Sequence, residues 1–184
     1  MSKLVFVAFI ILAGLNSGFS QKYFTKTGHI AFYSETKLEK FDAHNKSSGI
    51  VYDSQTGKLE AAALIKGFQF ERALMQEHFN ENYMESSKYP KATFKGMIDN
   101  YKTVDLTKNG KYNVKISGDL TMHGVTQKVA TDGQIVVNNG KIEATSAFNV
   151  ALADYKITIP ALVKDQISKT VKITITSNLE LLKQ

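Results

Sequence analysis

Residues 118–129 constrain the fold more than any other stretch, because a single strand register accounts for every residue in it. A two-residue turn at His123-Gly124, where glycine takes a positive φ at little steric cost, makes the two flanks a β-hairpin. The cross-strand pairs are then Met122 with Val125, Thr121 with Thr126, Leu120 with Gln127, and Asp119 with Lys128.

The two faces of this hairpin differ in polarity. The threonine pair and the Asp119–Lys128 pair share one face, and such pairs stabilise a solvated sheet surface. A slip of one residue would carry both charges to the apolar side, so the register is strongly specified. We therefore predict a half-buried hairpin whose dry face carries Leu120, Met122, Val125 and Val129.

Alternation of apolar and polar residues, the pattern of a half-buried strand, recurs along most of the chain. The strand at residues 58–66 is small and apolar on both faces, and its residues Ala61, Ala62 and Ala63 would leave room inside a barrel. The other predicted strands are 22–35, 94–99, 111–122, 125–137, 141–152 and 171–181, with shorter extended segments at 41–46 and 49–53 broken by Ser47-Ser48.

The apolar period changes at Phe70. Apolar residues recur at a spacing of three to four as far as Tyr83, which predicts an amphipathic helix over residues 70–86. Ser86-Ser87 and Pro90 end it. About eight strands with turns between them and one inserted helix fit an all-β fold, an antiparallel eight-stranded barrel.

The N-terminus predicts export. Lys3 gives a positive start, residues 4–15 form an apolar run, and small residues stand three and one before a cut ahead of Gln21. The run is shorter than the roughly twenty apolar residues of a membrane span, although an uncleaved anchor is the alternative. We expect residues 1–20 to be a cleaved signal peptide, residues 21–184 to form one barrel domain, and the product to be periplasmic or secreted.

Composition narrows the function classes. The chain has no cysteine, so an exported protein would depend on its core rather than on disulfides. The net charge of +6 becomes +5 without Lys3, but the lysines are dispersed and Arg72 is the only arginine, so nucleic-acid binding is not expected. A membrane-spanning β-barrel is also not expected, because four mid-strand lysines on its lipid-facing side would cost about 2–4 kcal/mol each near the midplane. They are Lys95, Lys115, Lys141 and Lys172.

No catalytic or metal motif stands out. The four histidines form no His-Glu-x-x-His sequence and no short His-x-His spacing. We expect His123 in the turn, where it tolerates an unusual φ, and His78 on the inner edge of the helix. There is no Gly-x-Ser-x-Gly elbow, no readable catalytic triad and no phosphate loop. The sequence therefore supports neither an enzyme nor a cofactor.

Two motifs lie about thirty residues apart: residues 88–94, Lys-Tyr-Pro-Lys-Ala-Thr-Phe, and residues 120–126, Leu-Thr-Met-His-Gly-Val-Thr. In this order and spacing they resemble the two signatures of the YceI-like family of bacterial lipid-binding proteins. The resemblance covers nearly all of the mature chain and implies an extended lipocalin-like barrel around an apolar channel. The implied partners are an apolar lipid, such as a polyisoprenoid or quinone, and transiently a membrane; the oligomeric state is left open.

The predicted helix departs from the family pattern. The family carries Arg-Asp-x-His-Leu there, and the matching residues 75–79 read Met-Gln-Glu-His-Phe. The histidine is retained as His78, whereas Met75 and Gln76 occupy the arginine and aspartate positions. Polar contacts that the family makes through those two positions are therefore not carried over.

Aromatic, thioether and aliphatic side chains gather near the helix and on the inward strand faces. They are either a packed core or the wall of a cavity, since methionine fills irregular space and small barrels can hold one ligand. The resemblance favours non-catalytic binding or carriage of a long apolar lipid over a filled structural or partner-binding barrel, or an unrecognised hydrolase. The candidate ligand-binding residues are Phe70, Met75, His78, Phe79, Tyr83, Phe94, Leu120, Met122, Phe148, Val150, Ile173 and Ile175.

Overall fold

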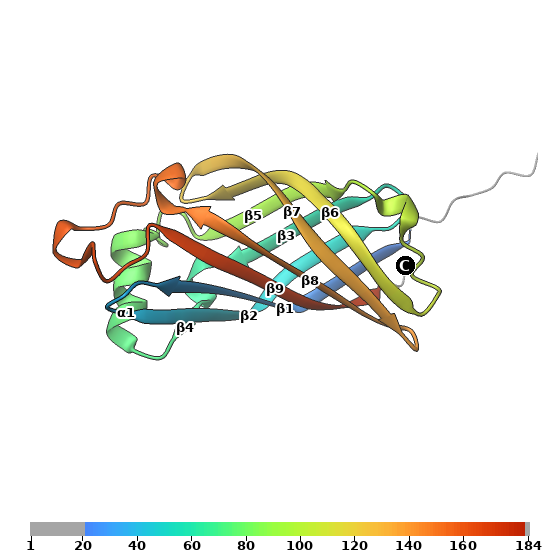
Figure 1. Ribbon diagram of the computed structural model, residues 1–184, viewed down its shortest axis with the longest axis horizontal. Helices are drawn as coiled ribbons and strands as arrows, with labels where there is room; N and C mark the ends of the chain where they lie inside the picture. Colours follow the sequence, from blue (N-terminus) through green and yellow to red (C-terminus); the bar gives the residue numbers. More distant parts are fainter. Residues whose placement is uncertain (1–20, 183–184) are drawn as a thin grey trace, which may run out of the picture.

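Eight long antiparallel strands close into a barrel in the computed structural model, which describes residues 21–182 (Figure 1). β1 pairs with both β2 and β9, and this double pairing closes the sheet. The predicted all-β, eight-stranded antiparallel barrel is confirmed, while the predicted signal peptide lies outside the described residues. The strands are β1 (Lys22–Glu35), β2 (Lys40–Asp53), β3 (Lys58–Leu64), β5 (Lys91–Ile98), β6 (Gly110–Met122), β7 (Val125–Asn138), β8 (Lys141–Ala151) and β9 (Thr170–Leu181).

Short elements fill the connections. The helical segment is α1 (Ala73–His78), which continues as a π-helical turn, η2 (Phe79–Tyr83). The prediction of a helix from residue 70 was wrong at that end, because the backbone of Phe70 pairs with Ala43 in a two-residue strand, β4 (Gln69–Phe70). The remaining turns are 3-10 helices: η1 (Ile65–Gly67), η3 (Tyr101–Thr103), η4 (Leu152–Tyr155) and η5 (Ala161–Val163).

The predicted break at Ser47-Ser48 was wrong, because β2 runs through it. The register between β1 and β2 shifts at Gly28, which pairs with Ser48. The fully buried Asn45 side chain bonds the polar groups of the two serines. Asn45 Oδ1 accepts hydrogen bonds from the Ser47 backbone N–H at 2.9 Å and from the Ser48 hydroxyl at 3.2 Å. Its Nδ2 donates to the Leu64 carbonyl at 2.9 Å. The serines therefore mark a bulge rather than a strand end.

The hairpin of β6 and β7 has the predicted register throughout. Asp119 pairs with Lys128, and Lys128 Nζ lies 2.7 Å from Asp119 Oδ1. The hydroxyls of Thr121 and Thr126 lie 2.8 Å apart on the same outer face. His123 and Gly124 have φ values of 51° and 73°, as a two-residue type I′ turn requires. The expected unusual φ at His123 is thus confirmed.

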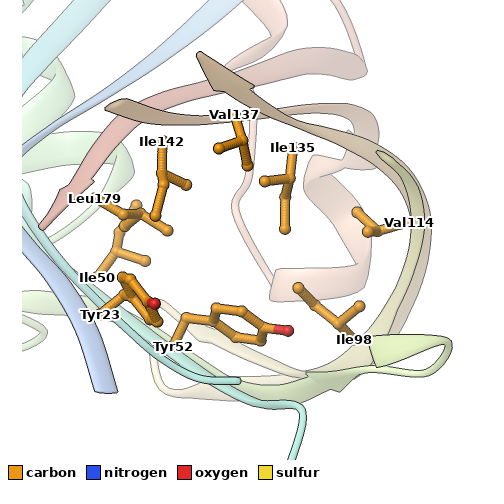
Figure 2. Close-up of a cluster of buried hydrophobic side chains, with 9 residues drawn as sticks. All are labelled: Tyr23, Ile50, Tyr52, Ile98, Val114, Ile135, Val137, Ile142 and Leu179. Carbon is orange, nitrogen blue, oxygen red and sulfur yellow. The ribbon is translucent and has the colours of Figure 1, made fainter. Parts of the chain in front are cut away.

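The two ends of the barrel differ. One end, beside the turn between β7 and β8, carries a ring of buried side chains that project inward from the wall (Figure 2). The other end carries α1 and the connection between β8 and β9 (Figure 1). We call this ring the closing cluster; it consists of Tyr23, Ile50, Tyr52, Ile98, Val114, Ile135, Val137, Ile142 and Leu179.

The backbone ladder between β7 and β8 covers only part of the two strands. The ladder between β7 and β8 extends from the turn only as far as the pair Gly133–Ser146, although both strands continue beyond it. Two hydroxyls join the strands at this fork. The Thr131 hydroxyl donates to the Ala147 carbonyl at 3.1 Å, and the Ser146 hydroxyl donates to the Asp132 carbonyl at 2.8 Å.

Candidate functional site

A cavity of about 500 Å³ runs inside the barrel. Its volume falls within the range of about 300–1,000 Å³ typical of small-molecule sites. Phe41 and Tyr52, eleven residues apart on β2, both line it. At about 3.3 Å per residue and a strand tilt of about 40°, this separation spans roughly 28 Å along the barrel axis. The cavity is therefore long and narrow, suited to a chain rather than to a compact ring.

Small side chains make this space. Ala61, Ala62 and Ala63 of β3 and Ala144 of β8 line the cavity, as the sequence predicted for the three alanines of β3. The wall around them is almost wholly apolar. The charged residues that line it are Glu39 and Arg72.

The cavity opens at the α1 end. Several lining residues there are exposed to solvent, including Arg72, Leu74 and His78 of the helical segment and Gln166 of the β8–β9 connection. At the opposite end, the cavity stops at the closing cluster. The cavity is therefore a tunnel with one mouth.

Four phenylalanine rings pack against one another in the wall of the tunnel near the mouth. We call them the aromatic cluster: Phe32, Phe68, Phe70 and Phe79, all of which line the cavity. Phe79 lies at the centre of this group, with ring centroids 5.4 Å from Phe32, 5.8 Å from Phe68 and 5.0 Å from Phe70. Three segments supply the four rings, since Phe68 directly precedes β4, so the cluster forms only when β1, β4 and η2 have come together.

Polar contacts fix the rim of the mouth. Arg72, at the start of α1, forms an ion pair with Glu39 in the turn between β1 and β2. The Ser168 backbone N–H donates to the Ser34 hydroxyl at 3.0 Å, which ties the β8–β9 connection to the end of β1. Three segments distant in sequence are thus held around one opening.

Eleven of the twelve candidate residues line the cavity. The exception is Val150, which is buried beside Tyr155 and Ile157 instead. His78 also differs from expectation, because it is exposed at the rim rather than packed on the inner edge of the helix. Whether the lining residues contact a ligand stays a prediction. The eleven candidates that line the cavity are Phe70, Met75, His78, Phe79, Tyr83, Phe94, Leu120, Met122, Phe148, Ile173 and Ile175.

Sequence reasoning missed Phe32, Phe68 and Tyr52 as cavity residues. Phe32 follows Ile30 on the inward face of β1, a signal that was available from the alternation of that strand. Phe68 and Tyr52 had no comparable signal. Phe68 follows a 3-10 turn, and Tyr52 lies beyond the bulge in β2.

The two sequence motifs meet in space at His123. Its Nδ1 lies 2.9 Å from the Tyr155 carbonyl oxygen, and its Nε2 lies 2.9 Å from Glu85 Oε2. The ring of Tyr89, from the other motif, packs edge-on at 4.9 Å between centroids. His123 therefore ties the hairpin to η4 and to the segment that follows η2.

Other chemistries find little support in residues 21–182. No group of three or more histidine, aspartate or glutamate side chains in this part of the chain could hold a metal ion. His29 Nε2 and His44 Nδ1 lie 2.9 Å apart on neighbouring strands, and neither residue lines the cavity. None of the helices described is long and apolar enough to cross a membrane.

A model of the YceI-like domain matches residues 20–179. The chain belongs to the YceI-like family. No curated protein matches the chain, whereas several solved structures share the fold of this YceI-like domain.

One similar structure is a polyisoprenoid binding domain from Saccharophagus degradans implicated in plant cell wall breakdown. It has a TM-score of 0.77 at 17% identity, over 89% of this chain and 99% of that one. BcnA from Burkholderia cenocepacia gives 0.67 at 14%, over 83% and 96%. A YceI protein from Campylobacter jejuni gives 0.51 at 19%, over 82% and 85%. At these identities the likeness shows the fold alone.

Proposed function

We propose that this YceI-like protein binds a long apolar lipid, such as a polyisoprenoid, inside its barrel and does not transform it chemically. The observation that carries the proposal is the tunnel of about 500 Å³ with an almost wholly apolar wall and one mouth. The polyisoprenoid binding domain among the similar structures supports this choice of ligand class. The tunnel also argues against the alternative of a barrel with a filled core.

Burial of the chain supplies the affinity. At about 0.8 kcal/mol per CH₂, ten buried carbons give a gross binding free energy of ~8 kcal/mol. This gross value corresponds to micromolar binding, and the costs of ordering are subtracted from it. Affinity should rise with chain length until the chain fills the tunnel.

Extraction of the purified protein into organic solvent, followed by mass spectrometry, tests the proposal. We expect an apolar lipid in near-stoichiometric amount, and rebinding of geranylgeraniol by the delipidated protein. Recovery of no lipid, together with no rebinding of added prenols, would overturn the assignment.

Export of the protein belongs to the same proposal. The charge of Lys3, the apolar run at residues 4–15 and the small residues before Gln21 support cleavage of a leader and a periplasmic or secreted location. Intact-mass analysis of the exported product should give a chain that begins at Gln21. A product that retains residues 1–20 would contradict this part of the proposal.

Three exposed leucines support transient contact of the mouth with a bilayer surface. Leu38, Leu74 and Leu162 are 72%, 62% and 95% exposed. They belong to the β1–β2 turn, α1 and η5, the segments that the Arg72–Glu39 and Ser168–Ser34 contacts hold at the mouth. A lipid that leaves a bilayer there could enter the tunnel without crossing water.

Replacing these three leucines with serine is expected to slow the uptake of lipid from phosphatidylcholine vesicles by about tenfold or more, because each exposed leucine contributes about 1.5 kcal/mol or more when buried in a bilayer. The measurement is the rate of transfer of a prenol from vesicles to protein. A matched control replaces three exposed apolar residues remote from the mouth and should leave the rate unchanged. Equal rates for both variants would refute the membrane contact. The control residues are Val51, Met97 and Leu181.

A further inference from the structure

The inner end of the tunnel contains a fully buried side-chain oxygen without a hydrogen-bond partner. Tyr52 is 1% exposed and lines the cavity, with its ring among the apolar side chains of the closing cluster. Figure 2 shows its hydroxyl pointing into that ring of side chains, toward Ile98. Within residues 21–182, this hydroxyl has no hydrogen-bond partner.

This hydroxyl is a potential donor in an apolar surrounding. Burial, as the main cause, raises the pKa of Tyr52 to about 12, so the phenol keeps its proton at physiological pH. A buried hydroxyl without a partner destabilises the folded protein, and such groups are therefore rare. On the same strand, by contrast, the side-chain oxygen and nitrogen of the buried Asn45 both have hydrogen-bond partners. The unpaired donor at Tyr52 is thus available to whatever fills the tunnel.

We propose that the Tyr52 hydroxyl binds an uncharged oxygen atom at the inner end of the lipid. The inference rests on the proposed function and makes it more specific. The ligand is then an apolar chain that carries a carbonyl or hydroxyl oxygen at one end and enters the tunnel with that end first.

The charges of the tunnel favour an uncharged group. Glu39 and Arg72, the charged residues that line it, pair with each other at the mouth. No basic side chain lines the inner end among the described residues, so a phosphate or carboxylate there would be desolvated without compensation. A neutral oxygen avoids this cost and gives the Tyr52 hydroxyl its missing partner.

The test compares two probes with the same number of carbons, 2-heptadecanone and heptadecane, in delipidated wild-type protein and in Tyr52→Phe. Tyr52→Phe should weaken binding of the ketone about 3- to 10-fold, the contribution of one neutral hydrogen bond, and leave binding of heptadecane unchanged. Delivery from cyclodextrin and quantification by mass spectrometry give both affinities.

Tyr23→Phe is the matched control. Tyr23 belongs to the same closing cluster and is 7% exposed, but it does not line the cavity. Its replacement removes the same kind of atom at nearly the same depth and should change neither affinity. Lipid-free Tyr52→Phe should melt at or above the temperature of the wild type, because it loses a hydroxyl that has no partner.

Each outcome bears on the inference. Unchanged ketone binding in Tyr52→Phe, with both probes bound by the wild type, would show that the hydroxyl holds at most a water molecule; it would overturn the inference and leave lipid binding intact. A marked loss of lipid-free stability would reveal a partner within the protein and also overturn it. Failure of the wild type to bind either probe would overturn both the inference and the proposed function.

Discussion

Ala144→Phe is expected to lower lipid retention at least about tenfold while the lipid-free protein keeps its stability to within about 1 kcal/mol. Ala144 lines the tunnel beside its strand partner Ile135, near the closed end. A phenyl ring placed there displaces at least two ligand carbons, and each contributes about 0.8 kcal/mol. A filled core would instead lose about 1–3 kcal/mol of stability through overpacking.

Ala147→Phe provides the control, since Ala147 is exposed on the outer face of the same strand. The measurement pairs the melting temperature of the delipidated protein with bound lipid by mass spectrometry. The control should match the wild type in both. If Ala144→Phe lost stability and retained its lipid, the tunnel would be packed core in solution.

His123→Ala is expected to destabilise the protein by about 3 kcal/mol. The side chain is 10% exposed, and both ring nitrogens face acceptors, the Tyr155 carbonyl and the Glu85 carboxylate. Removal of the ring leaves these two groups without this partner, and losses at charged hydrogen bonds are typically about 1.5–3 kcal/mol. Alanine also tolerates the positive φ at this position poorly. Urea unfolding, compared with the wild type, measures the loss.

Two further variants separate these causes. His123→Asn keeps a residue that accepts positive φ but cannot reach both acceptors, so it should retain most of the loss. Thr126→Ala removes a hydroxyl pair from the exposed face of the same hairpin and should cost less than about 1 kcal/mol. A His123→Asn variant as stable as the wild type would show that the turn matters and that the contacts to Glu85 and Tyr155 do not.

The hairpin of β6 and β7 could be predicted to the residue because its information is local. The turn at His123-Gly124 and the Asp119–Lys128 pair lie within a dozen residues, and the polarity of each face excludes other registers. The same alternation located most strands, and with them most of the cavity wall. Val150 was the exception, since alternation identifies an inward residue but not whether a cavity or packed side chains lie in front of it.

The helical segment shows where a local pattern misleads. The spacing of Phe70, Leu74 and Phe79 fits a helix, but all three line one cavity across a corner between β4 and α1. A common apolar interior produces the same spacing as a continuous helix, and the pairing of Phe70 with Ala43 decides between them.

The sequence could not predict the hydrogen-bond partners of His123, nor the absence of a partner for the buried Tyr52 hydroxyl within residues 21–182. Glu85 is 38 residues from His123, and Tyr155 is 32 residues away on the other side. The isolation of the Tyr52 hydroxyl depends on side chains from several strands that gather around it. Both features follow from closure of the barrel rather than from any segment alone.

The fork between β7 and β8, where the backbone ladder is missing, is a place at which the barrel wall can widen. At the fork, widening the wall requires only the release of the Thr131 and Ser146 hydroxyls from two carbonyls, whereas along the continuous β6–β7 ladder it would break backbone hydrogen bonds. Thr131 and Ser146 also line the cavity, so the fork borders the cavity directly. The closing cluster sets the length of the tunnel, whereas the width of the tunnel can change at the fork. If the proposed lipid binds there, the barrel should select lipids by their length and accept differences in their thickness, such as the methyl branches of an isoprenoid chain.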